Sequence, residues 1–100
     1  MKLSIIVPFY NEAERLPKSI GQILEYLENQ SHDWELILVD DGSRDNTIEY
    51  LNEFLTDIRI KLLTHEKNSG KGSAIRTGVL SSTGDLILFS DADLSTPSTS

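Results

Sequence analysis

Four short apolar runs alternate with helix-like segments along this chain, and that alternation limits the possible folds more than any other feature. The runs have the length of strands and cover residues 3–7, 35–39, 58–63 and 86–89. Segments with helical spacing of apolar residues follow the first three runs, at residues 15–29, after residue 46 and at residues 73–82. Strands that alternate with helices predict a parallel sheet with right-handed crossovers and helices on both faces. We therefore expect an α/β fold with a mainly parallel sheet, built as a single domain over residues 1–100.

Each expected helix has an apolar face and a recognisable start. The first follows a strand that we expect to end at Pro8, and Asn11 is expected to cap it, with Pro17 in its first turn. Asp45 or Asn46 is expected to cap the second. The side chains expected to face the sheet are Leu16, Ile20, Ile23, Leu24 and Leu27 in the first helix, Ile48, Leu51 and Leu55 in the second, and Ala74, Ile75 and Val79 in the third.

Charge and composition exclude several classes of function. The 16 acidic and 9 basic residues give a formal net charge of -7, which argues against a nucleic-acid partner. The same balance means that a phosphate ligand needs a metal ion or a local basic cluster beside the carboxylates. The absence of cysteine excludes disulfides and thiolate metal sites. No stretch approaches the roughly 20 apolar residues of a membrane span.

Polar side chains follow each expected strand at the point where it ends. Residues 10–12 come after the first strand, Asp40 and Asp41 after the second, Lys71 after the third, and Asp91 and Asp93 after the fourth. In open parallel sheets, ligands bind outside the carboxyl ends of the strands. The sequence therefore predicts one ligand site, formed by four loops at this edge.

The segment Asp91-Ala92-Asp93 is the strongest chemical signal. With one residue between them in an extended segment, the two carboxylates can project to the same side. Paired hard oxygen ligands suit Mg²⁺ or Mn²⁺, which would bridge to the phosphates of a nucleotide. A strand end followed by a solvated turn explains the same residues, so both interpretations stay open on this segment alone.

Asp40 and Asp41 also have two interpretations. Asp-Gly is a turn dipeptide, and Ser43 or Asp45 can cap the following helix. Only one carboxylate is needed for a turn, however, and two adjacent ones repel each other. The second has a use if it accepts hydrogen bonds from a base or a ribose.

The run Gly70-Lys71-Gly72-Ser73 resembles a phosphate-binding loop without matching either standard motif. A Walker A loop needs Ser or Thr directly after the lysine, where this chain has Gly72, and the third glycine of a dinucleotide fingerprint is replaced by Ile75. Two glycines before a helix still let the backbone approach an anion, and Lys71 offers a cation. An exposed lysine on a flexible loop is the alternative.

The remaining candidates are individual side chains rather than motifs. Tyr10 can stack on a nucleobase, and Glu12 can accept a hydrogen bond from it or simply begin the first helix. Trp34 is expected to pack in the core, and neither His32 nor His65 is assigned a role.

Together, four segments resemble glycosyltransferase family two, whose catalytic domain has the GT-A fold. They are SIIVPFYNEAERLP, ELILVDDGSRDNT, NSGKGSAIRTG and GDLILFSDADLSTP, in that order and on the expected elements. The resemblance covers about residues 3–97. It is nearest to enzymes that transfer a hexose to dolichyl or another polyprenyl phosphate, and it favours the glucosyl type over the mannosyl type.

The resemblance implies a fold and a set of roles. The fold is a Rossmann-like three-layer sandwich, the nucleotide-binding half of a GT-A fold. Base and ribose are surrounded by Pro8, Tyr10, Glu12, Asp40 and Asp41, while Lys71 and Ala92 also contact the nucleotide. Asp91 and Asp93 hold Mg²⁺ or Mn²⁺ against the diphosphate, and Asp93 is thereby the catalytic residue. A glutamine that completes the metal shell in the mannosyl relatives is replaced here by Ser95.

The implied activity is inverting, metal-dependent transfer from UDP-glucose, or alternatively GDP-mannose, to a polyprenyl phosphate. Family members continue well past the fourth strand, so we expect a truncated donor-binding fragment that is inactive alone and self-associates through its last strand. The intact protein would lie in the cytoplasm, at the cytosolic face of a membrane. A phosphatase of the haloacid dehalogenase type, a receiver domain and a ligand-free interaction domain are the alternatives.

Overall fold

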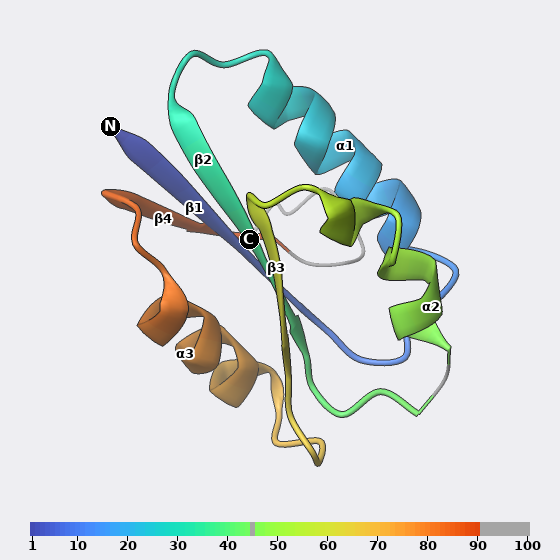
Figure 1. Ribbon diagram of the computed structural model, residues 1–100. Helices are drawn as coiled ribbons and strands as arrows, with labels where there is room; N and C mark the ends of the chain where they lie inside the picture. The colour runs from blue at the N-terminus through green and yellow to red at the C-terminus, as the bar shows by residue number, and fades with distance from the viewer. Residues whose placement is uncertain (45, 91–100) are drawn as a thin grey trace, which may run out of the picture.

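The computed structural model describes residues 1–44 and 46–90 and confirms the α/β prediction (Figure 1). Its four strands form one sheet in the order β3-β2-β1-β4, and every neighbouring pair is parallel. The strands are β1 (Lys2–Phe9), β2 (Asp33–Asp40), β3 (Ile60–Thr64) and β4 (Leu86–Phe89). The helices are α1 (Leu16–Glu28), α2 (Thr47–Leu51), the 3-10 helix η1 (Phe54–Thr56) and α3 (Lys71–Ser81).

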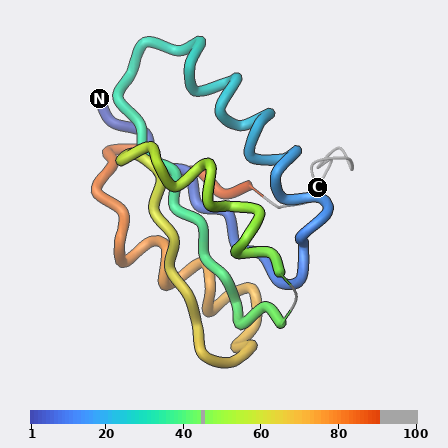
Figure 2. The backbone as a smooth tube through the Cα atoms, turned by 45° about the vertical axis from the view of Figure 1, so that its right-hand side comes forward, coloured from blue at the N-terminus to red at the C-terminus, as the bar shows by residue number. Residues whose placement is uncertain are grey.

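Helices cover both faces of the sheet, which gives the three expected layers (Figures 1 and 2). On one face, α1, α2 and η1 cover a core that includes Ile5 and Val7 of β1. On the other, α3 packs through Ala74 on Ile6 and Ile37. Because side chains alternate across a strand, burial of both faces explains why β1 and β2 are almost continuously apolar.

Trp34 is buried in the core under α1, as expected. The Arg59 guanidinium lies over it, 3.9 Å from the ring centroid. The indole is therefore used for packing and for a cation–π contact, and it is not available to a ligand.

The first strand was expected to end at Pro8, but it continues through Pro8 to Phe9, and Pro8 lies opposite Val39 of β2. The even-numbered residues of β1 direct their backbone groups towards β4, since the Lys2 and Ile6 carbonyls accept from Asp85 and Ser90. The last pair with β4 is Ile6 with Phe89. The missing N–H of Pro8 therefore faces the side where this pairing has already ended, which is where a strand tolerates proline.

Two further expectations about element boundaries were wrong. The third strand begins at Ile60 rather than residue 58, because Asp57 accepts the Arg59 amide at 2.9 Å and holds a turn there, leaving Ile58 93% exposed. The second helix ends at Leu51, and Leu55 belongs to η1. Asn46 occupies the N-cap position of α2 without a capping hydrogen bond from its side chain. Asp45 lies outside the described residues.

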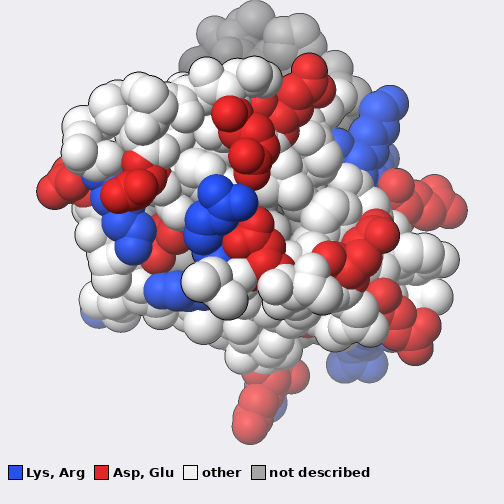
Figure 3. Space-filling model, turned by 45° about the horizontal axis from the view of Figure 1, so that its top comes forward, with Lys and Arg blue, Asp and Glu red and all other residues white. Residues whose placement is uncertain are grey.

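Acidic and basic side chains are interspersed on the molecular face drawn in Figure 3. The net charge of -7 is therefore not gathered there into a patch of one sign. Among the described residues, no helix has the length and apolar character needed to cross a membrane.

Candidate functional site

The loop from β1 to α1 is tied to the turn after β2 through Asn11. Its backbone N–H donates to Ser43 Oγ at 2.9 Å, and its side-chain Oδ1 accepts the Arg44 N–H at 2.8 Å. Asn11 has φ of 51°, a left-handed conformation that asparagine tolerates better than most residues. The expectation that Asn11 caps the first helix was wrong, because the N-cap position belongs to Arg15. The asparagine oxygen is engaged by the neighbouring turn instead.

Tyr10 and Glu12 lie on the same loop and reach the surface. Tyr10 is 38% exposed, so its ring is available to a ligand. Glu12 forms an ion pair with Arg15 at 3.9 Å, while its carbonyl accepts the Leu16 amide at 2.8 Å. The carbonyl of Glu12 thus opens the helix, and its carboxylate stays at the surface.

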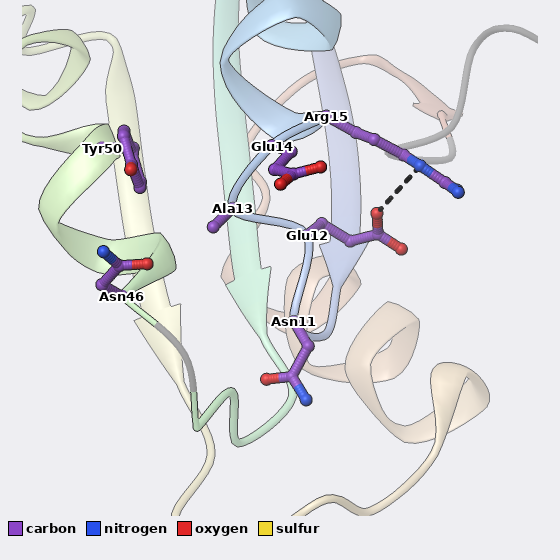
Figure 4. Close-up of a pocket in the computed structure, with 7 residues that line it drawn as sticks. All are labelled: Asn11, Glu12, Ala13, Glu14, Arg15, Asn46 and Tyr50. Carbon is purple, nitrogen blue, oxygen red and sulfur yellow. Dashed lines mark ion pairs between the residues drawn. The ribbon is translucent and has the colours of Figure 1, made fainter.

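A polar cleft of about 530 Å³ adjoins this loop (Figure 4). The loop forms one wall, and α2 with the residue before it forms the other. The residues that line it are Asn11, Glu12, Ala13, Glu14, Arg15, Asn46 and Tyr50. Its volume is within the range of small-molecule sites. Of the described residues that were expected to bind the nucleotide, Glu12 is the one that lines it.

Asp40 is buried, and its carboxylate shapes the turn after β2. Its Oδ1 accepts the Ser43 amide at 2.7 Å, and its carbonyl accepts the His65 amide at 2.8 Å. Gly42 follows with φ of 82°, and a Cβ at this position would lie 2.7 Å from the Asn68 nitrogen. The turn interpretation of Asp40 is therefore present in the structure, and Gly42 lets a second loop pack directly on that turn.

Asp41 is 4% exposed, and its carboxylate makes three hydrogen bonds with the segment after β3. The Ser69 amide donates to Oδ1 and the His65 ring contacts the same oxygen, both at 2.9 Å, and the Gly70 amide donates to Oδ2 at 2.8 Å. Burial raises the pKa of the Asp41 carboxyl, but these hydrogen bonds outweigh burial and hold the pKa below its ordinary value. Asp41 is therefore ionised at neutral pH and anchors the loop before α3.

His65 belongs to the candidate site through its contacts, and sequence reasoning missed it. Its Nδ1 lies 2.9 Å from Asp41 Oδ1, and its Nε2 lies 2.8 Å from Thr77 Oγ1. Its partners are 24 and 12 residues away in the sequence, so no local motif reveals them. The available signal was its place directly after a strand whose carboxyl end had already been assigned to the site.

The third helix begins two residues earlier than expected, at Lys71, with Gly70 in the N-cap position at φ of 98°. Lys71 is therefore the first residue of an 11-residue helix rather than part of a loop. Its exposed side chain lies at the end of the helix where backbone N–H groups favour anions.

The structure thus brings three of the four expected loops to one edge of the sheet. The turn after β2 contacts both neighbours: the Asp41 amide donates to the Phe9 carbonyl at 2.9 Å, and the Asp41 carboxylate holds Ser69 and Gly70. Pro8 is buried in β1 and contributes to the base of this edge.

The fourth loop, with Asp91, Ala92 and Asp93, lies outside the described residues. Within residues 1–44 and 46–90, no three His, Cys, Asp or Glu side chains are grouped so that they could hold a metal ion. The expected metal ligands therefore stay a prediction from the sequence.

Comparisons with known proteins agree on one family. The model of the family described as Glycosyl transferase family 2 matches residues 4–99. The dolichyl-phosphate beta-glucosyltransferase of Mus musculus is 45% identical over 101 residues, covering 92% of this chain and 31% of the relative. The chain therefore spans about three tenths of the length of the curated relatives it matches.

Two solved structures are similar in fold and in sequence. The mannosyltransferase PcManGT from Pyrobaculum calidifontis, in complex with GDP-Man and Mn²⁺, superposes with a TM-score of 0.79 at 28% identity. That match covers 91% of this chain and 27% of the other. S. aureus TarS in complex with UDP-GlcNAc gives a TM-score of 0.74 at 33% identity, covering 93% of this chain and 27% of the other.

Proposed function

The chain belongs to glycosyl transferase family 2, and on that premise we propose that it carries the donor-binding part of an enzyme that moves a hexose from a nucleotide sugar to a dolichyl or other polyprenyl phosphate. The observation that carries the proposal is the carboxyl edge of the sheet, where three loops meet around Asp41. A relative that acts on dolichyl phosphate and neighbours solved with GDP-Man and UDP-GlcNAc support the acceptor and the donor class. UDP-glucose is the favoured donor, and GDP-mannose is the alternative.

The proposed nucleoside position lies over the ends of β1 and β2. Pro8 and Asp40 are buried and form its base, while Tyr10 and Glu12 have side chains at the surface that can stack on and hydrogen-bond a base. Asp41 Oδ1 already has two partners and Oδ2 has one, so at most one lone pair of Oδ2 remains for a ribose or base.

The diphosphate is assigned to the start of α3. Lys71 is the first residue of that helix, where backbone N–H groups and a cation both favour an anion. The Gly70 backbone before it is held by Asp41 at 2.8 Å, so the helix start and the nucleoside position share one carboxylate.

The proposed metal ligands are Asp91 and Asp93, with Ala92 against the nucleotide. The Ser90 amide donates to the Ile6 carbonyl at 3.0 Å, so the described chain reaches the carboxyl edge immediately before Asp91. Two carboxylates are the donors that Mg²⁺ and Mn²⁺ prefer, and a neighbour is solved with Mn²⁺. Such an ion, when bound, stabilises the negative charge that develops on the leaving diphosphate.

The proposed reaction is an inverting displacement at the anomeric carbon. The protein's contribution is to hold donor and acceptor in line, which supplies a large share of the barrier reduction. A phosphate acceptor is already anionic near neutral pH, so it needs less help from a protein base than a hydroxyl does. Because the chain spans 31% of the length of its relative, we propose that these 100 residues bind donor without transferring the sugar.

Calorimetric titration with UDP-glucose and GDP-mannose, each with and without Mn²⁺, tests this function. We expect metal-dependent binding, tighter for UDP-glucose, and Asp93→Ala should remove the metal dependence. Wild-type binding that is equally tight with and without Mn²⁺ would contradict the metal assignment. The absence of binding of either donor would contradict the function. Incubation with radiolabelled UDP-glucose, Mn²⁺ and a polyprenyl phosphate tests transfer, and turnover above a protein-free control would contradict the donor-only assignment.

Self-association is proposed through β4, an edge strand in the described sheet. Leu86, Leu88 and Phe89 are 45%, 39% and 56% exposed, and an open apolar edge invites pairing with a second copy. Sedimentation over a dilution series is the measurement, and a monomer at every concentration would contradict the proposal.

The alternatives are not favoured. A dehalogenase-type phosphatase carries its nucleophile after the first strand, whereas the Asp91-Ala92-Asp93 segment follows β4. A receiver domain needs a phosphorylatable aspartate after the third strand, where this chain has His65. The family match over residues 4–99 favours the transferase over both, and over an interaction domain.

A further inference from the structure

A continuous chain of side chains joins the ends of β2 and β3 to α3. It runs from Asp41 through the ring of His65 to Thr77, with contacts of 2.9 and 2.8 Å. The Asp41 and His65 side chains are 6% and 16% exposed. Thr77 lies on the second turn of α3, and its hydroxyl is also 3.1 Å from the Ser73 carbonyl. Three elements that are distant in sequence are therefore linked by one imidazole.

The charge on Asp41 decides which ring nitrogen carries the proton. An ionised carboxylate only accepts hydrogen bonds, so His65 Nδ1 must be the donor in this contact. In the neutral ring, Nε2 is then an acceptor, and the Thr77 hydroxyl divides its single proton between this nitrogen and the Ser73 carbonyl. His65 thus fixes the orientation of Asp41 on one side and is itself fixed from α3 on the other.

The loop at residues 66–70 depends on this arrangement for its shape. Residues 66–69 are largely exposed, so core packing does not determine their conformation. Contacts that do so include the Ser69 and Gly70 amides on Asp41, the Ser69 hydroxyl on the Lys67 carbonyl at 3.2 Å, and the close approach of Lys67 and Asn68 to Gly42. The loop leads directly into the start of α3.

We propose that His65 is a positioning residue, which holds Asp41 and the 66–70 loop in the arrangement that receives the diphosphate of the donor. The proposal rests on the proposed function. An exposed loop held by buried polar side chains, beside a cation at a helix N-terminus, is organised for a ligand rather than for the core. His65 touches neither the ligand nor the reacting atoms, and it acts through Asp41.

The test compares four variants of the chain by calorimetry with UDP and with uridine, at one Mn²⁺ concentration. His65→Leu removes both contacts, whereas His65→Asn keeps a donor near the position of Nδ1. Thr77→Val removes the hydroxyl at nearly constant volume. His32→Ala is the matched control, because His32 is an exposed histidine on the loop before β2. Amide exchange of Ser69 and Gly70, followed by NMR without nucleotide, reports the loop itself.

We expect His65→Leu to weaken UDP roughly tenfold and to speed exchange of both amides, with a smaller loss for uridine, because only one lone pair of Asp41 is assigned to the nucleoside. His65→Asn should recover most of the UDP affinity, Thr77→Val should lose part of it, and His32→Ala should match wild type. Unchanged UDP affinity in His65→Leu overturns the proposal, and so does an equal loss of UDP and uridine, which would mark a general structural role. If wild type binds neither compound, the proposed function fails. Amide exchange then tests separately whether His65 holds the 66–70 loop. Unchanged exchange in His65→Leu overturns that role, and faster exchange upholds it.

Discussion

Both ends of β2 carry a buried carboxylate, and the two carboxylates differ in what they hold. Glu35 near its start and Asp41 just after its end are buried carboxylates, 2% and 4% exposed, on the face that packs against α3. Ile37 and Val39 lie between them in the apolar contact with α3. Asp41 accepts backbone N–H groups from the loop that enters α3, and Glu35 accepts the Thr83 amide at 2.6 Å from the loop that leaves it. One strand therefore holds both ends of one helix.

The difference lies in the partners. Glu35 also accepts the Ser4 hydroxyl at 2.6 Å and pairs with Lys61 at 3.1 Å and Lys2 at 3.7 Å. Burial raises the pKa of Glu35, but these hydrogen bonds and the Lys61 charge outweigh it and lower the pKa to about 2. Where Glu35 pairs with lysines, Asp41 contacts His65, and the 66–70 loop that Asp41 holds is exposed. The comparison indicates that the Glu35 end maintains the fold, whereas the Asp41 end holds the exposed loop at which we propose that the donor binds.

The largest expected effect is at the Glu35 end. Glu35→Ala leaves the Thr83 amide, the Ser4 hydroxyl and Lys61 without their buried partner, and should reduce the free energy of unfolding by about 3 kcal/mol, the amount that the lowered pKa of Glu35 corresponds to. Urea denaturation measures this loss. Glu28→Ala is the control, because the Glu28 side chain is 59% exposed and should matter little. Equal stabilities in the two variants would contradict the structural role of Glu35.

Acid should remove the same contribution in the wild-type chain. The pKa of Glu35 is about 2 in the folded chain and 4.5 ordinarily, so its contribution is complete above pH 4.5 and disappears as the pH falls towards 2. The expected loss is about 3 kcal/mol over that window, followed by denaturation at several pH values. Glu35→Gln should flatten the profile and leave a smaller slope from Asp41, whose pKa is also lowered. An unchanged profile in Glu35→Gln would refute the assignment.

Alanine substitutions at two glycines distinguish an effect on the stability of the fold from an effect on UDP binding. A Cβ at Gly42 would lie 2.7 Å from the backbone of the 66–70 loop, and a Cβ at Gly84 would lie 2.8 Å from the Ser4 nitrogen. Each substitution to alanine should cost about 1–3 kcal/mol of unfolding free energy. Only Gly42→Ala should also weaken UDP, because only that loop adjoins the site. Calorimetry on both variants checks this, and a comparable loss of UDP affinity in Gly84→Ala would erase the distinction between the two ends.

The smallest effect on stability is expected for Lys71→Ala. The side chain is exposed, so the free energy of unfolding should change by less than about 0.5 kcal/mol. UDP binding should weaken roughly threefold to tenfold and uridine binding should not, because the proposed contact is with the diphosphate. Titration with both compounds is the measurement, and an equal loss for uridine would place Lys71 beside the nucleoside instead.

Much of the fold could be predicted because its causes are local. The strand at Leu86–Phe89 has the predicted bounds, and α1 matches its prediction to within one residue at each end. Apolar periodicity reports burial directly, and burial fixes these elements. The boundaries that were wrong depend on side chains acting across turns, as when Asp57 holds the Arg59 amide and delays β3.

Part of the candidate site could be predicted for the same kind of reason. Parallel strands bring their carboxyl ends to one edge, so the polar residues after each strand already located Asp40, Asp41 and Lys71 together. The roles of Asp91 and Asp93 stay predictions. What local reasoning could not give was the partner of each group, since Asn11 bonds to the turn after β2 instead of capping a helix.

The sequence by itself determined the α/β class, the parallel sheet and the edge at which a ligand is expected to bind, because periodicity and strand order are properties of short segments. Only the tertiary structure decided that Asp41 accepts hydrogen bonds from the loop before α3 and that His65 connects Asp41 to Thr77. It also decided that Glu35 binds the loop after α3 at the other end of β2. A buried carboxylate takes whichever donors the fold brings within about 3 Å, and those donors come from segments that only folding places side by side.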